Sequence, residues 1–125
     1  MIASDTHISK FIESLDTIRF YSGAQPKSVF DIPDGDMLLE MRDCKIRMAD
    51  FSFALEKIGN WSGCPVMSGT SSYFRYTSST DPTVVIQGSA GLVGTELLFS
   101  SPFVAGKEVV VDVFMIRPYC PQVFA

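Results

Sequence analysis

The stretch that decides the fold reads EVVVDVFMI and covers residues 108–116. Every odd-numbered position from 109 to 115 is apolar, and this period of two predicts a β-strand with one buried face. The even-numbered positions are apolar as well, apart from Glu108 and Asp112. We therefore expect the second face to be covered too, by an N-terminal helix or by another subunit.

Shorter segments rich in β-branched and aromatic residues precede this stretch, and clusters of turn-forming residues separate them. We expect strands at 17–22, 37–42, 66–77, 83–87 and 95–99. Residues 44–58 suit a strand in one part and a helix in another, and we predict a strand there. Asp81 and Pro82 predict a turn. The loop from Gly88 to Gly94 holds no Lys or Arg, so it predicts a hairpin connection rather than a phosphate site.

These segments together predict a mainly β fold, an antiparallel β-sandwich of jelly-roll-like or immunoglobulin-like type. One short helix is expected to precede it at residues 1–16, where apolar residues recur at helical spacing. Those residues are Ile8, Phe11, Ile12 and Leu15. The apolar tail at 118–125 begins with Pro118 and contains Pro121, and prolines cannot continue a regular ladder. We expect this tail to be an arm that packs on another surface.

The size and charge of the chain narrow its class. It has 125 residues, of which 46% are hydrophobic, so we expect a single domain over 1–125 with a substantial core. Ten Lys and Arg against fourteen Asp and Glu give a net charge of −4, which provides no general basic field for phosphates. The N-terminus lacks the pattern of an export signal, and no apolar stretch approaches a membrane span. We expect a protein that binds neither nucleic acid nor membranes.

Motifs of common enzyme classes, such as G-x-S-x-G, H-E-x-x-H or a P-loop, do not occur in the sequence. The single histidine, His7, lies near the N-terminus, where we expect an exposed helical residue rather than a general base. Asp31, Asp34 and Asp36 superficially suit calcium. However, the sixth and twelfth positions counted from Asp31 are Asp36 and Arg42 instead of Gly and Glu, so we expect a solvated loop. We predict no enzymatic activity, no metal, no cofactor and no small-molecule substrate.

The three cysteines, Cys44, Cys64 and Cys120, are an odd number and too widely spaced for a CxxC ligand pair. We expect buried, reduced thiols. Cys120 is the exception, because its place between two prolines of the tail would let it bond to a neighbouring subunit.

Aromatic residues between positions 61 and 76 leave two alternatives open. Trp61, Tyr73, Phe74 and Tyr76 either form a platform that stacks on sugar rings or fill the core. We favour core filling, and keep a carbohydrate-binding module that uses Trp61 and Tyr76 as a third candidate function.

Three collinear segments carry a resemblance to a known family. They read SLDTIRFYSGAQP at 14–26, GTSSYFRYTSSTDPTVVIQGSAG at 69–91 and GTELLFSSPFVAGKEVVVDVFMI at 94–116. In order and spacing they resemble a family of small proteins encoded among the virion structural genes of tailed bacteriophages. That family has an L-x-I-Y-x-G-x-Q-P strand after an N-terminal helix, then a G-T-A-x-W-F-R-like strand, a D-G-S-V-G-like turn, an A-D-L-x-L-like strand, a V-A-G loop and a V-x-V-x-x-F-x-I-like closing strand. The motif positions matched here are Gly23, Pro26, Gly69, Phe74, Arg75, Gly88 and Gly91.

The resemblance also has departures. Tyr73 stands where the family tends to have Trp, Glu96 replaces a common Asp, and residues 44–63 and 118–125 match nothing in the family pattern. These two unmatched stretches are where an interface particular to this protein would reside.

The resemblance implies a virion structural protein, assembled in the bacterial cytoplasm. We expect a capsid decoration or cement protein that binds the major capsid protein lattice as a homo-oligomer, with a neck, tail or fibre-attachment component as the alternative. The predicted interface residues are Phe103, Val110, Phe114, Ile116, Tyr119, Val123 and Phe124.

Overall fold

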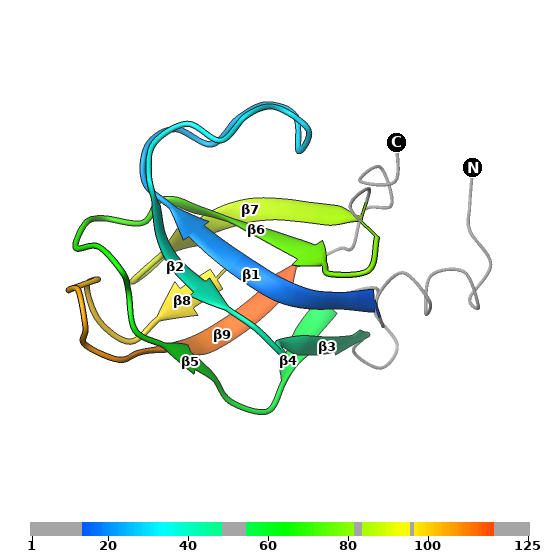
Figure 1. Ribbon diagram of the computed structural model, residues 1–125. Helices are drawn as coiled ribbons and strands as arrows, with labels where there is room; N and C mark the ends of the chain where they lie inside the picture. The colour runs from blue at the N-terminus through cyan, green and yellow to red at the C-terminus, as the bar shows by residue number, and fades with distance from the viewer. Residues whose placement is uncertain (1–13, 49–54, 82–83, 96, 117–125) are drawn as a thin grey trace.

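A computed structural model describes residues 14–48, 55–81, 84–95 and 97–116 (Figure 1). These residues form a mainly β structure with almost no helix, which confirms the predicted class. Within these ranges nine strands follow one another: β1 (Leu15–Tyr21), β2 (Met37–Met41), β3 (Lys45–Met48), β4 (Leu55–Ile58), β5 (Trp61–Gly63), β6 (Tyr73–Ser78), β7 (Val85–Gly91), β8 (Leu97–Phe99) and β9 (Val109–Ile116).

Seven of the strands form a nearly closed sheet. Six of them hydrogen-bond in the order β2-β1-β6-β7-β8-β9, and β5 pairs with β9 on the far side. β5 also lies against β2, and just beyond it the amide of Val66 donates to the carbonyl of Leu38 at 2.9 Å. β4 and β3 extend the sheet from the other end of β9. The curled sheet therefore encloses its own core (Figure 1).

The first strand begins earlier than the sequence predicts. Leu15 and Asp16 belong to β1 and not to a helix, so the predicted helix over 1–16 is wrong at its last two residues. Leu15 pairs with Ser78 of β6, and its side chain is fully buried, so tertiary pairing outweighs the local helical spacing. Residues 1–13, which carry the rest of that prediction, lie outside the described residues.

The glycine-rich stretch after residue 87 is not a loop throughout. β7 continues through Gly88 to Gly91, which corrects the predicted hairpin loop. β8 then runs parallel to β7, with Ala90 opposite Leu97, so the two strands are not a hairpin. Thr95 folds back against Gly91 in the short connection between these strands. A Cβ at position 91 would lie only 3.1 Å from the Cγ2 of Thr95, so a residue without a side chain makes room for this connection.

The closing strand β9 changes its buried face part-way. Leu98 pairs with Val113 but Phe99 pairs with Val111, so Asp112 is an extra residue on β9. Such a bulge reverses the pleat, because side chains alternate with a period of two. Phe114 is therefore buried and Val113 is 45% exposed, which corrects the prediction that all odd-numbered positions face the core.

The core is one cluster in which aromatic rings meet from distant strands. The ring centroids of Phe20 and Phe103 are 5.5 Å apart, and those of Trp61 and Phe114 are 5.3 Å apart. Such pairs contribute about 0.5–1.5 kcal/mol each beyond the burial of their area. The buried members are Leu15, Ile18, Phe20, Leu38, Leu39, Met41, Cys44, Ile46, Trp61, Phe74, Tyr76, Ile86, Ala90, Leu97, Phe99, Phe103, Val109, Val111 and Phe114.

Candidate functional site

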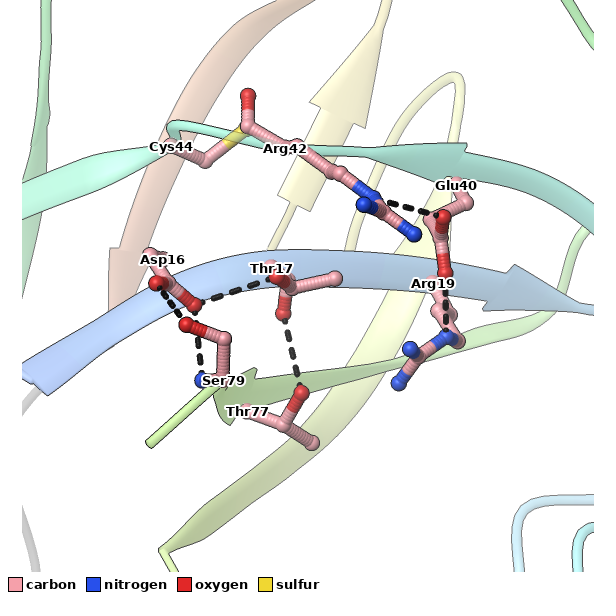
Figure 2. A network of polar contacts seen from close by, with 8 residues as sticks. All are labelled: Asp16, Thr17, Arg19, Glu40, Arg42, Cys44, Thr77 and Ser79. Atoms are coloured by element: carbon pink, nitrogen blue, oxygen red, sulfur yellow. Dashed lines mark hydrogen bonds and ion pairs between the residues drawn. The ribbon is translucent and has the colours of Figure 1, made fainter. Parts of the chain in front are cut away.

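A polar network lies on the side of β1 that faces away from the core (Figure 2). Both carboxylate oxygens of Asp16 accept from Ser79, one from its amide at 2.9 Å and the other from its hydroxyl at 2.5 Å. The hydroxyl of Thr17 donates to the same carboxylate at 3.1 Å. Burial opposes the ionisation of Asp16, but the hydrogen bonds from Ser79 and Thr17 outweigh it and hold the pKa of this carboxyl below its ordinary value of 3.8.

Glu40 forms the second half of the polar network. Its carboxylate accepts from the Nε of Arg19 at 2.7 Å and from the Nε of Arg42 at 3.1 Å. Burial again opposes ionisation, and the two arginines outweigh it and lower the pKa of Glu40 below 4.5. Arg19 lies opposite Glu40 in the β1–β2 register, so the ion pair is a direct cross-strand contact.

These groups border an open pocket of about 600 Å³. Its lining residues are Asp16, Thr17, Arg19, Arg42, Asp43, Thr77, Ser78 and Ser79. The two aspartates balance the two arginines, so the lining carries no net charge. Ser79 does donate to Asp16, but a carboxylate with a lowered pKa is a weak base for a serine hydroxyl. We therefore assign the polar network a structural role, which is to tie the start of β1 to the end of β6.

A second concave site lies between loops at one end of the sheet. The segment before β6 and the segments that follow β7 and β8 meet there. Together they enclose a groove of about 290 Å³, which we call the end groove. It is lined by Gly69, Thr70, Ser71, Gly91, Leu92, Val93, Phe99, Pro102 and Phe103, none of which is charged. Val93 is 79% exposed and Leu92 half exposed, so apolar side chains reach the solvent at its rim.

Hydrogen bonds between two loops hold one wall of the end groove. The amide of Gly69 donates to the carbonyl of Phe103 at 3.2 Å, and the amide of Ala105 donates to the hydroxyl of Ser68 at 2.8 Å. Phe103 fills the space beneath, with its ring centroid 4.7 Å from that of Phe99. The wall is thus fixed by both backbone bonds and core packing.

The long connection between β1 and β2, residues 22–36, is the third candidate; we call it the arm loop. Figure 1 shows it as the blue-to-cyan excursion beyond the sheet. Side chains of β6 and β7 fasten it: Tyr73 donates to the carbonyl of Asp34 at 2.8 Å, and Gln87 donates to that of Pro26 at 2.6 Å. Between these points Ile32 is 90% exposed and Phe30 is 57% exposed. Two large apolar side chains therefore stand in solvent on a fastened loop.

The predicted interface residues have three different outcomes. Phe103 and Phe114 are buried in the core, so their side chains do not form an exposed interface, and that part of the prediction is corrected. Val110 is half-buried on β9. The side chain of Ile116 and residues 117–125, which include Tyr119, Val123 and Phe124, lie outside the described residues.

The family-motif positions have structural roles in the described chain. Gly23 adopts a φ of +85° beside Asp34 of the arm loop, and Gly69 bridges to Phe103. Phe74 belongs to the core, and Gly88 is buried within β7. The remaining three are Pro26, whose carbonyl accepts from Gln87, Arg75, which is 8% exposed under the arm loop, and Gly91 at the end of β7.

The aromatic platform proposed for sugar binding is not exposed. Trp61, Tyr73, Phe74 and Tyr76 are all at most 2% exposed. Core filling is confirmed for Trp61, Phe74 and Tyr76, which belong to the core cluster, whereas Tyr73 is buried against Tyr21 and the arm loop. The hydroxyl of Tyr76 is buried and donates to the carbonyl of Cys44, and burial raises its pKa. The carbohydrate-binding alternative loses the residues on which it rested.

The two described cysteines differ in exposure. Cys44 is buried, as predicted, and burial together with the charges of Asp43 and Asp16 raises the pKa of its thiol to about 12. Cys64, which directly follows β5, is exposed, so the prediction of burial is wrong for it. Cys120 lies outside the described residues. Within the described ranges, no group of three or more His, Cys, Asp or Glu side chains is placed to hold a metal ion.

Comparison with models of known protein families, with characterised proteins and with solved structures found no match to this chain. Across 14–48, 55–81, 84–95 and 97–116 there is no helical segment with the length and hydrophobicity that crossing a bilayer requires.

Sequence reasoning missed the residues that make the two exposed apolar sites. Phe30 and Ile32 lie among turn formers, and Leu92 and Val93 lie between glycines. An apolar residue that interrupts a loop of Gly, Pro and Asp is a usable signal, because loops run over the surface and cannot bury it by themselves.

Proposed function

We propose that this protein is a structural component of a tailed-bacteriophage virion, a capsid decoration protein that binds the lattice of the major capsid protein. The collinear resemblance at 14–26, 69–91 and 94–116 supports the family. The jelly-roll-like or immunoglobulin-like type of sandwich remains part of this hypothesis.

The observation that carries the proposal is the end groove. An open concavity with apolar walls and no charged lining residue is suited to protein contact, because burying it costs no desolvation of charge. In the polar network, by contrast, the carboxylates of Asp16 and Glu40 accept hydrogen bonds from residues of the same chain. The described surface therefore favours assembly over chemistry.

In this function, binding energy accumulates over many symmetric copies. Each copy adds a modest apolar contact to a lattice that repeats the same site, and copies linked in one oligomer act at high effective concentration. The protein would stabilise a shell by binding its assembled state and not its free subunits.

Size-exclusion chromatography with light scattering tests the proposal, using the purified protein alone and mixed with capsids that lack it. We expect binding in a fixed ratio of one copy or one oligomer per lattice position. Binding to isolated tails or necks but not to capsids would move the protein to the alternative, a neck, tail or fibre-attachment component. Absence of binding to all three particles would overturn the virion role.

A further inference from the structure

We propose that the linkage between Asp34 and Gly35 is a site of spontaneous isoaspartate formation, and that hydrogen bonds at the base of the arm loop slow this reaction in the folded protein. The inference concerns a covalent modification and does not depend on the proposed function. The modification would alter the loop that presents Phe30 and Ile32 to the solvent.

The two residues supply the groups that the reaction needs. Asp34 is the one aspartate of the sequence that precedes a glycine. In the first step the main-chain nitrogen of Gly35 attacks the side-chain carboxyl carbon of Asp34, a carbon–nitrogen bond forms, and one water molecule leaves. Glycine has no Cβ to hinder this approach, and the attack is intramolecular, so it needs no second molecule. Both residues are exposed, so solvent reaches the linkage.

Water then opens the five-membered succinimide ring at one of its two carbonyl carbons. Opening at the original side-chain carbon restores aspartate. Opening at the original main-chain carbon gives isoaspartate, in which the former main-chain carbonyl is a free carboxylate and the Cβ atom belongs to the main chain. The second step takes up the water that the first step released, and nothing is oxidised or reduced. The main chain therefore becomes one carbon atom longer at the base of the arm loop.

The folded chain holds both oxygen-bearing groups of Asp34. Its carboxylate Oδ2 accepts a hydrogen bond from the amide of Ala24 at 3.3 Å, and its main-chain carbonyl accepts one from the hydroxyl of Tyr73 at 2.8 Å. An intramolecular attack proceeds only from a narrow range of torsion angles. These two bonds, one on the side chain and one on the main chain, restrict the torsion angles of Asp34.

The residues beside the linkage restrict it further. The amide of Asp36 donates to the hydroxyl of Ser22 at 2.9 Å, and the amide of Ser22 donates to the carbonyl of Asp36 at 3.0 Å. Gly35 has little free space between them, because a Cβ on it would lie 2.1 Å from the carbonyl oxygen of Ser22. Ring closure therefore proceeds through a locally opened loop, and its rate follows the population of that open state.

Peptide mapping of protein incubated at neutral pH measures the reaction. The peptide that contains the succinimide is lighter by one water, whereas the isoaspartate peptide keeps its mass and changes its retention time. Asp31 is an internal control in the same loop, because the β-branched Ile32 follows it and crowds the attacking nitrogen. We expect both products at Asp34 and at least about ten-fold less at Asp31.

Three variants separate the effect of the fold from that of the local sequence. Tyr73→Phe removes the hydrogen bond to the carbonyl of Asp34, and Ser22→Ala removes the acceptor of the Asp36 amide. Tyr21→Phe removes a hydroxyl from the ring that stacks on Tyr73 at a centroid separation of 5.2 Å, and is the matched control. Each lost bond should raise the native rate about two- to ten-fold, and the control should leave it unchanged. In concentrated urea all four proteins should react at one common, higher rate.

The outcomes distinguish the site from its restraint. Circular dichroism first shows which variants are folded, and either Tyr73→Phe or Ser22→Ala alone is sufficient for the test. Equal native rates in the parent and the loop variants, or a native parent that reacts as fast as the protein in urea, would overturn the restraint. Absence of isoaspartate at Asp34 in urea would overturn the site itself. The virion role is tested separately by binding to capsids, so its failure would leave this inference in place.

Discussion

The guanidinium of Arg75 donates through Nη2 to the carbonyl of Ser28 at 3.3 Å, across a separation of 47 residues. Its Nε donates to Gln87 at 3.0 Å, and Gln87 in turn donates to the carbonyl of Pro26. The side chain is 8% exposed, and its hydrogen bonds to described residues go to neutral acceptors. β6 and β7 thus set the position of the arm loop, and with it that of Phe30 and Ile32.

Replacement of Arg75 by leucine should release the arm loop while the sheet stays folded. Loss of its hydrogen bonds should lower the free energy of unfolding by about 1–2 kcal/mol. Trypsin should cut after Lys27 faster, because that bond lies in the loop between the two anchored carbonyls. Mass spectrometry of the first cleavage product measures the effect.

Arg42→Leu is the matched control for that variant. The Arg42 side chain is 75% exposed and binds only Glu40 among the described residues. Its loss should leave cleavage after Lys27 unchanged. Equal acceleration in both variants would show that Arg75 does not hold the loop.

Asp16→Asn should destabilise the protein in a pH-dependent way. The folded state lowers the pKa of Asp16, so its carboxylate adds stability above the ordinary value of 3.8, and that stability is lost as pH falls through the folded pKa. The difference in unfolding free energy between parent and variant should be largest near pH 7, about 1–2 kcal/mol, and should shrink below pH 4.

Urea unfolding at pH 7 and pH 3 measures that difference. Asp112→Asn, at an exposed carboxylate on β9, controls for the loss of one negative charge. A difference for Asp16→Asn that stays the same at both pH values would mean that the bonds to Ser79 do not depend on ionisation.

The sequence predicts the elements whose own alternation determines them. β2 lies within its expected range, and β9 differs from its expected range only by beginning one residue later. Both strands were predictable because apolar and β-branched side chains dominate them. Features that depend on distant partners were not predictable. The bulge at Asp112 follows from pairing with β8, and Leu15 joins a strand because Ser78 lies opposite. The end groove could not be predicted for the same reason, because its wall is formed by residues 69 and 103, which lie far apart in the sequence.

The two described cysteines should react at very different rates. Cys64 is exposed, whereas Cys44 is buried and has a pKa of about 12, so little thiolate forms at neutral pH. Iodoacetamide at pH 8 followed by peptide mapping should label Cys64 in the native protein, and Cys44 only after unfolding. Native labelling of both at one rate would refute the burial of Cys44.

Removal of residues 118–125 tests the predicted C-terminal arm. We expect the shortened protein to keep the thermal unfolding temperature and circular dichroism of the parent and to lose incorporation into particles. Replacement of the same residues by a Gly-Ser segment of equal length separates the effect of sequence from that of length. Unchanged incorporation would remove the tail from the interface.

Two glycines with similar backbone angles should tolerate alanine very differently. Gly35 has a φ of +80° and Gly94 a φ of +73°, so a side chain strains the backbone by about 1–2 kcal/mol at either position. At Gly35 an added Cβ would also lie 2.1 Å from the carbonyl oxygen of Ser22, whereas nothing lies within 4 Å of it at Gly94. The amide of Ser22 donates a hydrogen bond to the carbonyl of Asp36, which holds Ser22 in place, so the clash cannot relax at low cost. Chemical denaturation should therefore show Gly35→Ala to be less stable than Gly94→Ala by about 1–3 kcal/mol. An equal loss of unfolding free energy in the two variants would mean that the contact between Ser22 and Gly35 can open without destabilising the sheet. The hydrogen bonds from β6 and β7 would then be what holds the arm loop.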